Sequence, residues 1–586
     1  MWPLDWVVLV TLILTPAALG IWRALLHTAR GRRHGDDADP TRGDDGGVAP
    51  KAAAARPAAA KSMGVVTVGL SLLASNLSGI TLLGYPAEVY RYGTQFWMVA
   101  VGAVLATAVL CVGYLPVLHG LRLSSSYEYL ELRFDARVRK LTSIMYTVRL
   151  LLLLPLVLYV PALAFTQVTG MGIRIIAPAI SVVCIVYTTV GGLRTVSLTG
   201  SMQLLIMLTA SVAILAAGLY DVGGVGAAWR SMEASGRIEF FNLDPNPLTR
   251  TTFWSATVGG SFFWLQMLAV QPNSVQRYLA VPTLSAARRT AYLQCAGLLL
   301  TTTLACSLGG VLYAKYEGCD PLTTKEVQRA DQLVALMVEQ TSGRVPGLAG
   351  LFLAGLLSAA MGNLSAALNT LSSTLYADLV AGWLPDKWRS RSGVVVKVLG
   401  VLIGVWATLL VFVVERLGGL VQVAMSLGSV TSGTMLGLFT LGMLVPRANT
   451  LGALAGAAVS VLGTALVVFG QQSAIAAGSL HWPTKPSNAD DCAESGSGLA
   501  ALPGVLTEAA PSEVLAVLRL SYLWLVLLGA ALTMVSGTIV SLLTSSAGAA
   551  AVDPALLFGR GRRQVHQHEL GVIVAEKPTP QVDRDG

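Results

Sequence analysis

The sequence predicts an all-α polytopic membrane protein, and three observations support that fold class. Of its 586 residues, 54% are hydrophobic and only 12% are charged, whereas soluble domains average about 25% charged residues. Apolar runs of roughly 18 residues or more, each long enough to cross a ~30 Å hydrocarbon core, recur along the whole chain. The 60 glycines suit the close helix packing of membrane bundles.

These runs predict about 13 transmembrane helices. They lie at residues 6–26, 64–88, 96–118, 142–166, 171–190, 201–221, 253–276, 290–314, 347–380, 395–415, 418–444, 451–470 and 519–545. The first run is an anchor and not a signal peptide, because no Lys or Arg precedes it, while Arg23, Arg30, Arg32 and Arg33 follow it. This charge order places the N-terminus outside.

The connections between the runs then orient the other helices. Basic residues recur in alternate connections, at 133–140, 194, 277–289, 387–391, 447 and 560–563. With an outside N-terminus all of them fall on the cytoplasmic side, as the positive-inside rule requires, and the C-terminus is inside. Topology thereby explains the formal net charge of +8, so no nucleic-acid partner is expected.

Polar segments divide the chain in agreement with this topology. Residues 28–63 form a cytoplasmic loop and residues 546–586 a cytoplasmic tail, and both are predicted to be disordered. Residues 222–252 and 471–518 are extracellular loops. The membrane part comprises an N-terminal helix at 1–27, five-helix groups at 64–221 and 253–444, and C-terminal helices within 445–545.

The six cysteines do not form a disulfide scaffold. Four of them lie in predicted spans, where they serve as small apolar packing residues: Cys111, Cys184, Cys295 and Cys306. Cys319 and Cys492 fall in outside loops, where the oxidising environment permits a bridge. The sequence is equally compatible with a disulfide and with two free thiols at this pair.

The stretch from Gly362 to Asp378 is polar although it lies in an apolar span. It carries hydroxyl and amide side chains at Asn363, Ser365, Asn369, Thr370, Ser372, Ser373 and Thr374. Such side chains are expensive at membrane depth unless they face protein or a water-filled path. This helix is therefore expected to line a route for a polar solute.

Two predicted spans are interrupted in comparable ways. The span at 64–88 contains Asn76, Ser78, Gly79, Gly84 and Pro86, and the span at 253–276 contains Gly259, Gly260, Gln271, Pro272 and Asn273. Each interruption alone reads as a kink tolerated for packing. Because the two spans begin the two five-helix groups, the matching breaks favour a transporter site, where unwound backbone offers carbonyls to a cation and helix N-termini to an anion.

Four stretches resemble the sodium:solute symporter family, in the branch that carries monocarboxylates, iodide and multivitamins. They are residues 72–96, 125–139, 186–196 and 350–369. The resemblance runs from about residue 64 to 545. It implies a LeuT-type fold of two inverted five-helix repeats with flanking helices, and alternating access around a midplane site.

The same resemblance implies a function. We expect a secondary-active plasma-membrane transporter for small organic anions such as monocarboxylates, with Na⁺ as coupling ion and no other cofactor. Its expected partners are the solute and the lipid bilayer, and no obligate protein partner is inferred. An enzyme is not expected, because the sequence has no metal-spaced His/Cys/Asp cluster and no P-loop. A sodium-independent or proton-coupled carrier, a leak channel and a transport-dead sensor share this fold and differ in the site.

The resemblance places the family's sodium site where the first broken helix meets the span at 347–380. Its three carbonyl ligands correspond to Ala74, Leu77 and Ala359, and any residue supplies a carbonyl. Its two hydroxyl ligands correspond to Gly362 and Asn363. Gly362 has no side-chain oxygen and Asn363 offers its amide carbonyl, whereas a hard cation needs oxygen ligands to replace its water.

A carboxylate near the cation is also replaced. The family's Gly-Gly signature continues to Trp-Thr-Asp, whereas here the triplet ends in Gly200. These losses weaken Na⁺ binding by at least several kcal/mol if nothing compensates, at roughly 1–3 kcal/mol per neutral group and more for the charge. Either Na⁺ coupling is weakened or lost, or Asn363 with a rearranged Ser358 or Ser365 still binds the ion.

The substrate cavity is expected at the same depth. By resemblance and by proximity to the helix breaks, it includes Asn76, Thr81, Gln271, Gln422 and Met425. The alternative for each polar member is an interhelical hydrogen bond, worth about 0.6–2 kcal/mol in membranes.

Overall fold

The computed structural model describes residues 1–16, 18, 64–121, 123, 125–389, 391–414, 420–488, 492, 515–544 and 552–559, without the side chains of 187, 190–198, 420–425 and 427. No strand occurs among the described residues, as the all-α prediction requires. Eight helices are long and apolar enough to cross a membrane, and a bent pair would make a ninth, counting only these residues.

Each predicted span contains helix in its described part, and the first helix is Pro3–Pro16. The others are α2 (Val65–Asn76), α3 (Gly79–Tyr92), α4 (Val99–Val109), α5 (Leu115–Gly120), α6 (Glu128–Arg133), α7 (Ala136–Thr169), α8 (Ile173–Val222), α9 (Val225–Ala234), α10 (Gly260–Ala269), α11 (Pro272–Leu279), α12 (Leu284–Lys315), α13 (Leu333–Ser342), α14 (Leu348–Leu375), α15 (Asp386–Arg389), α16 (Ser392–Val414), α17 (Leu420–Leu444), α18 (Thr450–Ala476) and α19 (Leu525–Thr544).

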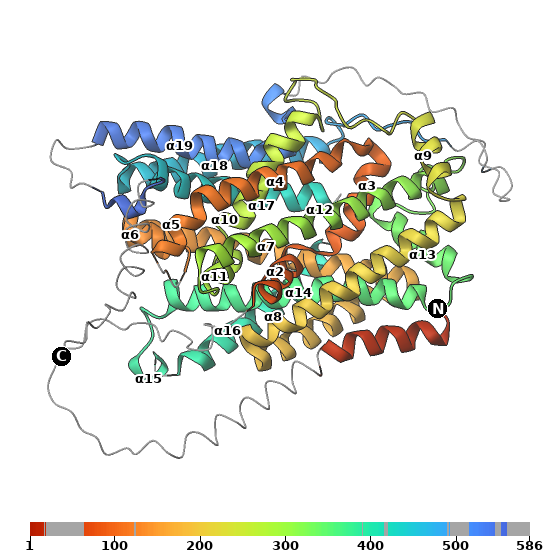
Figure 1. Ribbon diagram of the computed structural model, residues 1–586, viewed down its shortest axis with the longest axis horizontal. Helices are drawn as coiled ribbons and strands as arrows, with labels where there is room; N and C mark the ends of the chain where they lie inside the picture. The colour runs from red at the N-terminus through yellow and green to blue at the C-terminus, as the bar shows by residue number, and fades with distance from the viewer. Residues whose placement is uncertain are drawn as a thin grey trace, which may run out of the picture.

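The long helices run roughly side by side along the longest axis of the molecule (Figure 1). The N-terminus, α9 and α13 lie at one end, and α6 and α15 lie at the other (Figure 1). Segments predicted to be extracellular and segments predicted to be cytoplasmic therefore gather at opposite ends of the bundle.

One predicted boundary differs from the structure. Residues 171–190 and 201–221 are predicted as two helices, whereas α8 is helical throughout its 50 residues. The connection between the predictions contains Gly191 and Gly192 but no proline. Glycine costs only about 1 kcal/mol in a helix interior, so these two residues do not end the helix.

Both interrupted spans are broken helices. Between α2 and α3 the axis bends by 60°, and Leu77 and Ser78 have extended backbone. The Ser78 side chain caps α3 by accepting from the Ile80 N–H at 3.3 Å. The second break lies between α10 and α11, where Gln271 is extended and Pro272 begins α11. A proline at the first helical position has no N–H to leave unsatisfied, which explains why the helix restarts there.

At the α6 end of the bundle, basic side chains bind helix termini. The Arg133 guanidinium donates to backbone carbonyls at the end of α17 and in the turn after it, namely those of Gly442, Val445, Pro446 and Ala448. Arg139 pairs with Asp378 at 2.6 Å. A cation at a helix C-terminus satisfies carbonyls that have no partner within the helix.

The predicted disorder of the tail is wrong for residues 552–559. The Tyr129 hydroxyl donates to the Leu556 carbonyl at 3.1 Å, and the Phe558 N–H donates to the Met443 carbonyl at 2.9 Å. Leu556 is buried, and Gly113 leaves room for the Phe558 ring. The apolar sequence Ala-Leu-Leu-Phe thus buries itself against the bundle, because removing such side chains from water is favourable.

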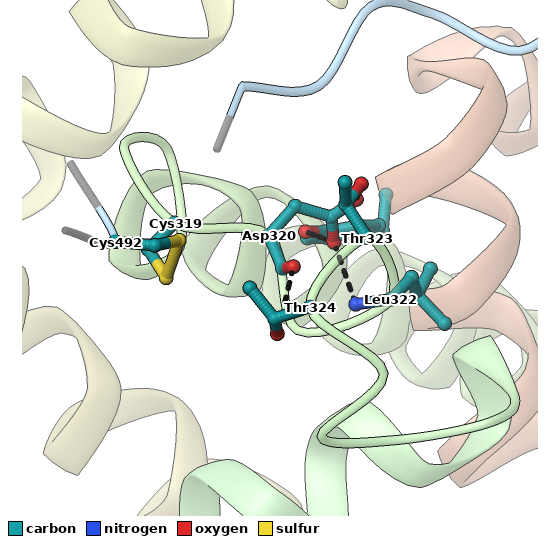
Figure 2. The surroundings of a disulfide bond; sticks show 7 residues. Cys319, Asp320, Leu322, Thr323, Thr324 and Cys492 are labelled. Carbon is teal, nitrogen blue, oxygen red and sulfur yellow. Dashed lines mark hydrogen bonds between the residues drawn. A yellow bond between two sulfur atoms is a disulfide. The ribbon is translucent and has the colours of Figure 1, made fainter. Parts of the chain in front are cut away.

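At the opposite end, a disulfide joins Cys319 to Cys492 (Figure 2). The neighbouring Asp320 is buried, and its carboxylate accepts from the Leu322 N–H at 3.1 Å and the Thr323 hydroxyl at 2.8 Å. The Tyr90 hydroxyl of α3 donates to the same carboxylate at 2.7 Å. The bridge fixes the segment after α12 to Cys492, and Asp320 fixes it to α3 of the broken first span.

Replacing Cys319 by Ser is expected to lower the free energy of unfolding by about 2–4 kcal/mol, because the bridge closes a long loop in the unfolded chain. The two cysteines are 173 residues apart. Thermal unfolding of the purified protein with and without reductant measures this. Reductant should lower the melting temperature of the wild type and leave that of Cys319→Ser unchanged. A wild type that is insensitive to reductant would contradict the prediction.

Candidate functional site

Three of the predicted cation-site positions converge in the structure. A Cβ built on Gly362 of α14 would lie 3.7 Å from the Ala74 carbonyl oxygen, and one built on Gly200 of α8 would lie 3.7 Å from the Ala74 Cβ. Ala74 lies in the last turn of α2, directly before the break. The end of α2 therefore faces two positions from which side-chain oxygens are missing.

The other predicted ligands flank this point. Leu77 is buried at the break with extended backbone, and Ala359 is buried one turn before Gly362 on α14. Asn363 is half-buried. The Ser365 hydroxyl donates to the Gly362 carbonyl at 3.1 Å, so its proton is directed into its own helix.

Gln203 of α8 also reaches this point, and the sequence interpretation overlooked it. Its Oε1 lies 3.1 Å from the position of a Cβ on Gly362. This oxygen is buried and has no hydrogen-bond partner among the described residues. Buried polar atoms are nearly always paired, so an oxygen left without a donor is suited to a cation or a water. Its place one turn after Gly200 is the signal that the sequence offered.

A buried positive charge lies beside α2, about one turn before Ala74. Arg277 of α11 donates through Nη1 to the Ser71 carbonyl and the Ser75 hydroxyl, both at 2.5 Å, and to the Ser71 hydroxyl at 3.0 Å. A Cβ on Gly200 would lie 4.0 Å from that Ser71 hydroxyl. No carboxylate pairs with Arg277 within the described part of the chain. The guanidinium therefore adds positive charge beside position 200, where the sequence has a glycine and no acid.

Three of the predicted substrate-cavity residues have described contacts, each with different neighbours. Thr81 lines a small cavity of about 10 Å³ between α3, α8 and α12, together with Ser211 and Thr301. The Asn76 amide donates to the Leu72 carbonyl of its own helix at 3.1 Å. Gln422 and Met425 belong to α17, but their side chains lie outside the described residues.

Gln271 lies at the second break and is the best-connected of the predicted residues. With its carboxamide oriented to satisfy both groups, its oxygen accepts from Nη1 and Nη2 of Arg149, the latter at 2.9 Å. Arg149 is the only charged residue in the span predicted at 142–166. A lone charge in a membrane helix marks a functional position, and this signal was available in the sequence.

The polar face of α14 lines a larger cavity. An open pocket of about 490 Å³ lies between α8, α14 and α16, with Thr188, Asn369, Ser372, Ser373 and Lys397 on its wall. This cavity lies between Gly362 and the α15 end of α14. Of the seven side chains predicted to line a polar route, Asn369, Ser372 and Ser373 therefore face this cavity.

Comparison with known proteins shows which family and which transporters this chain is similar to. Residues 58–460 match the model of the sodium:solute symporter family. Sodium-coupled monocarboxylate transporter 2 of Homo sapiens is 33% identical over 497 residues, which are 85% of this chain and 80% of that protein. The Danio rerio transporter of the same name is 35% identical over 401 residues, which are 68% of this chain and 64% of that protein.

The solved structure of a Na⁺-coupled sialic acid symporter, in a substrate-bound outward-open state, matches 93% of this chain and 99% of that chain with a TM-score of 0.70. At 22% identity this likeness concerns the fold alone. It confirms the predicted all-α architecture of the LeuT type.

Proposed function

Because the chain belongs to the sodium:solute symporter family, we propose that it is a secondary-active carrier of small organic anions such as monocarboxylates, working by alternating access with an altered sodium site. The family uses Na⁺ as its coupling ion. The chain is accordingly a multi-pass plasma-membrane transporter and not an enzyme. The monocarboxylate class comes from the relatives named above.

The main observation that supports an altered sodium site is that Gly200 and Gly362 converge on Ala74. The residues present fit a cation only in part. The Ala74 carbonyl and the unpaired Gln203 Oε1 are suitable oxygen ligands. No carboxylate is contributed at position 200, and the buried Arg277 repels a second cation.

We therefore favour Na⁺ coupling that is weakened or lost at this site. The competing interpretation keeps Na⁺ on Asn363 with Ser358 or Ser365, and the unpaired Gln203 oxygen gives it an additional ligand. The cavity lined by the polar face of α14 supports a solute path in either case.

Uptake of radiolabelled monocarboxylates, with iodide and biotin for comparison, in oocytes tests the proposal. We expect monocarboxylate uptake of comparable size in sodium and in choline medium. Preloaded substrate should accelerate uptake, since a carrier exchanges across the membrane and a leak channel does not. Uptake that vanishes in choline would mean that Na⁺ still binds, and the proposed weakening would be wrong.

A further inference from the structure

Arg149 is a buried positive charge within a membrane-spanning helix. It lies about 20 Å along α7 from Ala136, at about 1.5 Å per residue, and is 6% exposed. Charged residues at this depth are rare, and they mark ion or substrate pathways when they face a protein interior.

Its guanidinium lies where three elements meet. Nη1 and Nη2 donate to the Gln271 amide oxygen at the break between α10 and α11. Nη2 also lies 3.4 Å from the Met267 sulfur of α10. From the third side, a Cβ on Gly428 of α17 would lie 3.7 Å from Nε. The charge thus faces the second helix break, α10 and α17.

Arg149 has no carboxylate partner among the residues that the structure describes. Asp378, whose charge acts on the neighbouring Tyr127, is bound by Arg139 at 2.6 Å and by the Ser143 hydroxyl. The neutral amide of Gln271 therefore takes the place of an anion. A buried guanidinium that is held by a neutral acceptor is stabilised when a carboxylate replaces that acceptor, because the hydrogen bonds become stronger and the charge is paired.

Other donors near this charge are also unpaired. The Arg149 Nε and the Tyr127 hydroxyl are buried without a hydrogen-bond partner among the described residues. Unpaired buried donors are costly, and an oxyanion is a ligand that can accept hydrogen bonds from such donors.

We propose that Arg149 recognises the carboxylate of the transported organic anion, which displaces the Gln271 amide oxygen and accepts two hydrogen bonds from the guanidinium. This inference rests on the proposed function and assigns recognition of the substrate's negative charge to one residue. Bidentate recognition selects a planar carboxylate over a neutral amide of the same shape.

Uptake of radiolabelled lactate, with lactamide as the uncharged competitor, tests this assignment. Arg149→Gln is expected to raise the apparent KM for lactate by about 30-fold or more, because the carboxylate of the bound lactate loses its charged partner. Arg149→Lys keeps the charge without the planar fork and should fall between. Arg137→Gln on the same helix, whose side chain is 80% exposed, is the matched control and should behave as the wild type.

Gln271→Glu separates recognition from a structural role. Its carboxylate would stay on the guanidinium, so lactate uptake should fall about 30-fold or more while the purified protein melts no lower than the wild type. Lactate, but not lactamide, should also raise the melting temperature of the wild type and leave that of Gln271→Glu unchanged.

If Arg149 only supports the helix break, Gln271→Glu strengthens that contact and transports lactate with an unchanged KM, which overturns the assignment and leaves the proposed function intact. Retained uptake in Arg149→Gln would do the same. A wild type that takes up none of the monocarboxylates overturns the proposed function and this assignment together.

Discussion

Glu88→Gln is expected to lower the free energy of unfolding by about 3–5 kcal/mol, because it leaves a buried guanidinium without its counter-charge. Glu88 of α3 pairs with Arg250 at 2.7 Å, and the two side chains are 9% and 7% exposed. Burial lowers the pKa of Arg250, but the attraction and hydrogen bond of Glu88, together with the nearby Tyr522 and Tyr92, raise that pKa overall. Because Gln keeps the shape of the Glu side chain, the decrease in the free energy of unfolding measures the contribution of the charge.

The pair holds three segments together. The Arg250 guanidinium lies 4.1 Å from the ring centre of Tyr92 and 5.0 Å from that of Tyr522. The Ser521 hydroxyl donates to the Arg250 carbonyl. Loss of the pair should therefore loosen the segment before α10 and the start of α19 as well as α3.

Thermal unfolding of the purified protein measures the effect. The matched control is Asp386→Asn in α15, whose partner Arg389 lies at 3.6 Å and which is 99% exposed. An exposed pair contributes about 0–1 kcal/mol, so the control should melt close to the wild type. Equal melting temperatures for Glu88→Gln and the control would show that the buried pair adds nothing.

The fold was largely predictable because its signals are strong and local. Apolar length identifies membrane helices, and Pro272 and Ser78 act directly on the backbone at the two breaks. The uninterrupted α8 and the packed Leu556 were not predictable in this way. Helix continuation over Gly191 and Gly192 depends on packing, and the burial of a short apolar segment depends on a distant surface.

The backbone positions of the site could be predicted from the sequence, but the side chains now found near those positions could not. Resemblance placed Ala74, Gly200 and Gly362 at one site, and these positions do converge. Gln203 and Arg149 lie outside the four stretches that resemble the family. That Gln203 Oε1 and Arg149 Nε have no partner among the described residues is visible only once the neighbouring helices are in place.

If Na⁺ coupling is weakened as we propose, restoring the family's ligands is expected to create Na⁺ dependence. The triple variant Gly200→Asp, Gly362→Ser and Asn363→Ser regains a carboxylate and two hydroxyls. At roughly 1–3 kcal/mol per neutral group and more for the charge, Na⁺ affinity should rise by at least about 100-fold. Uptake in sodium and choline media, and the rise of melting temperature with Na⁺ against K⁺, measure the change.

The structure says how each substitution should be accommodated. A Cβ at position 200 makes only ordinary contacts at 3.7 and 4.0 Å, so Gly200→Asp has room. A Cβ at position 362 lies 3.1 Å from the Gln203 Oε1, so Gly362→Ser requires that flexible side chain to turn away. Gln203→Ala added to the triple variant should then leave Na⁺ dependence intact, because the restored hydroxyls have taken over its place.

Gly200→Asp alone is the informative control, because Arg277 competes for the new carboxylate. Arg277 Nη1 lies 3.0 Å from the Ser71 hydroxyl, which a Cβ at position 200 approaches to 4.0 Å. We expect this single variant to melt higher than the wild type without responding to Na⁺, since its charge pairs with the guanidinium. If the triple variant shows no Na⁺ dependence either, the altered ligands are not what weakens coupling, and the buried charge of Arg277 becomes the cause to test.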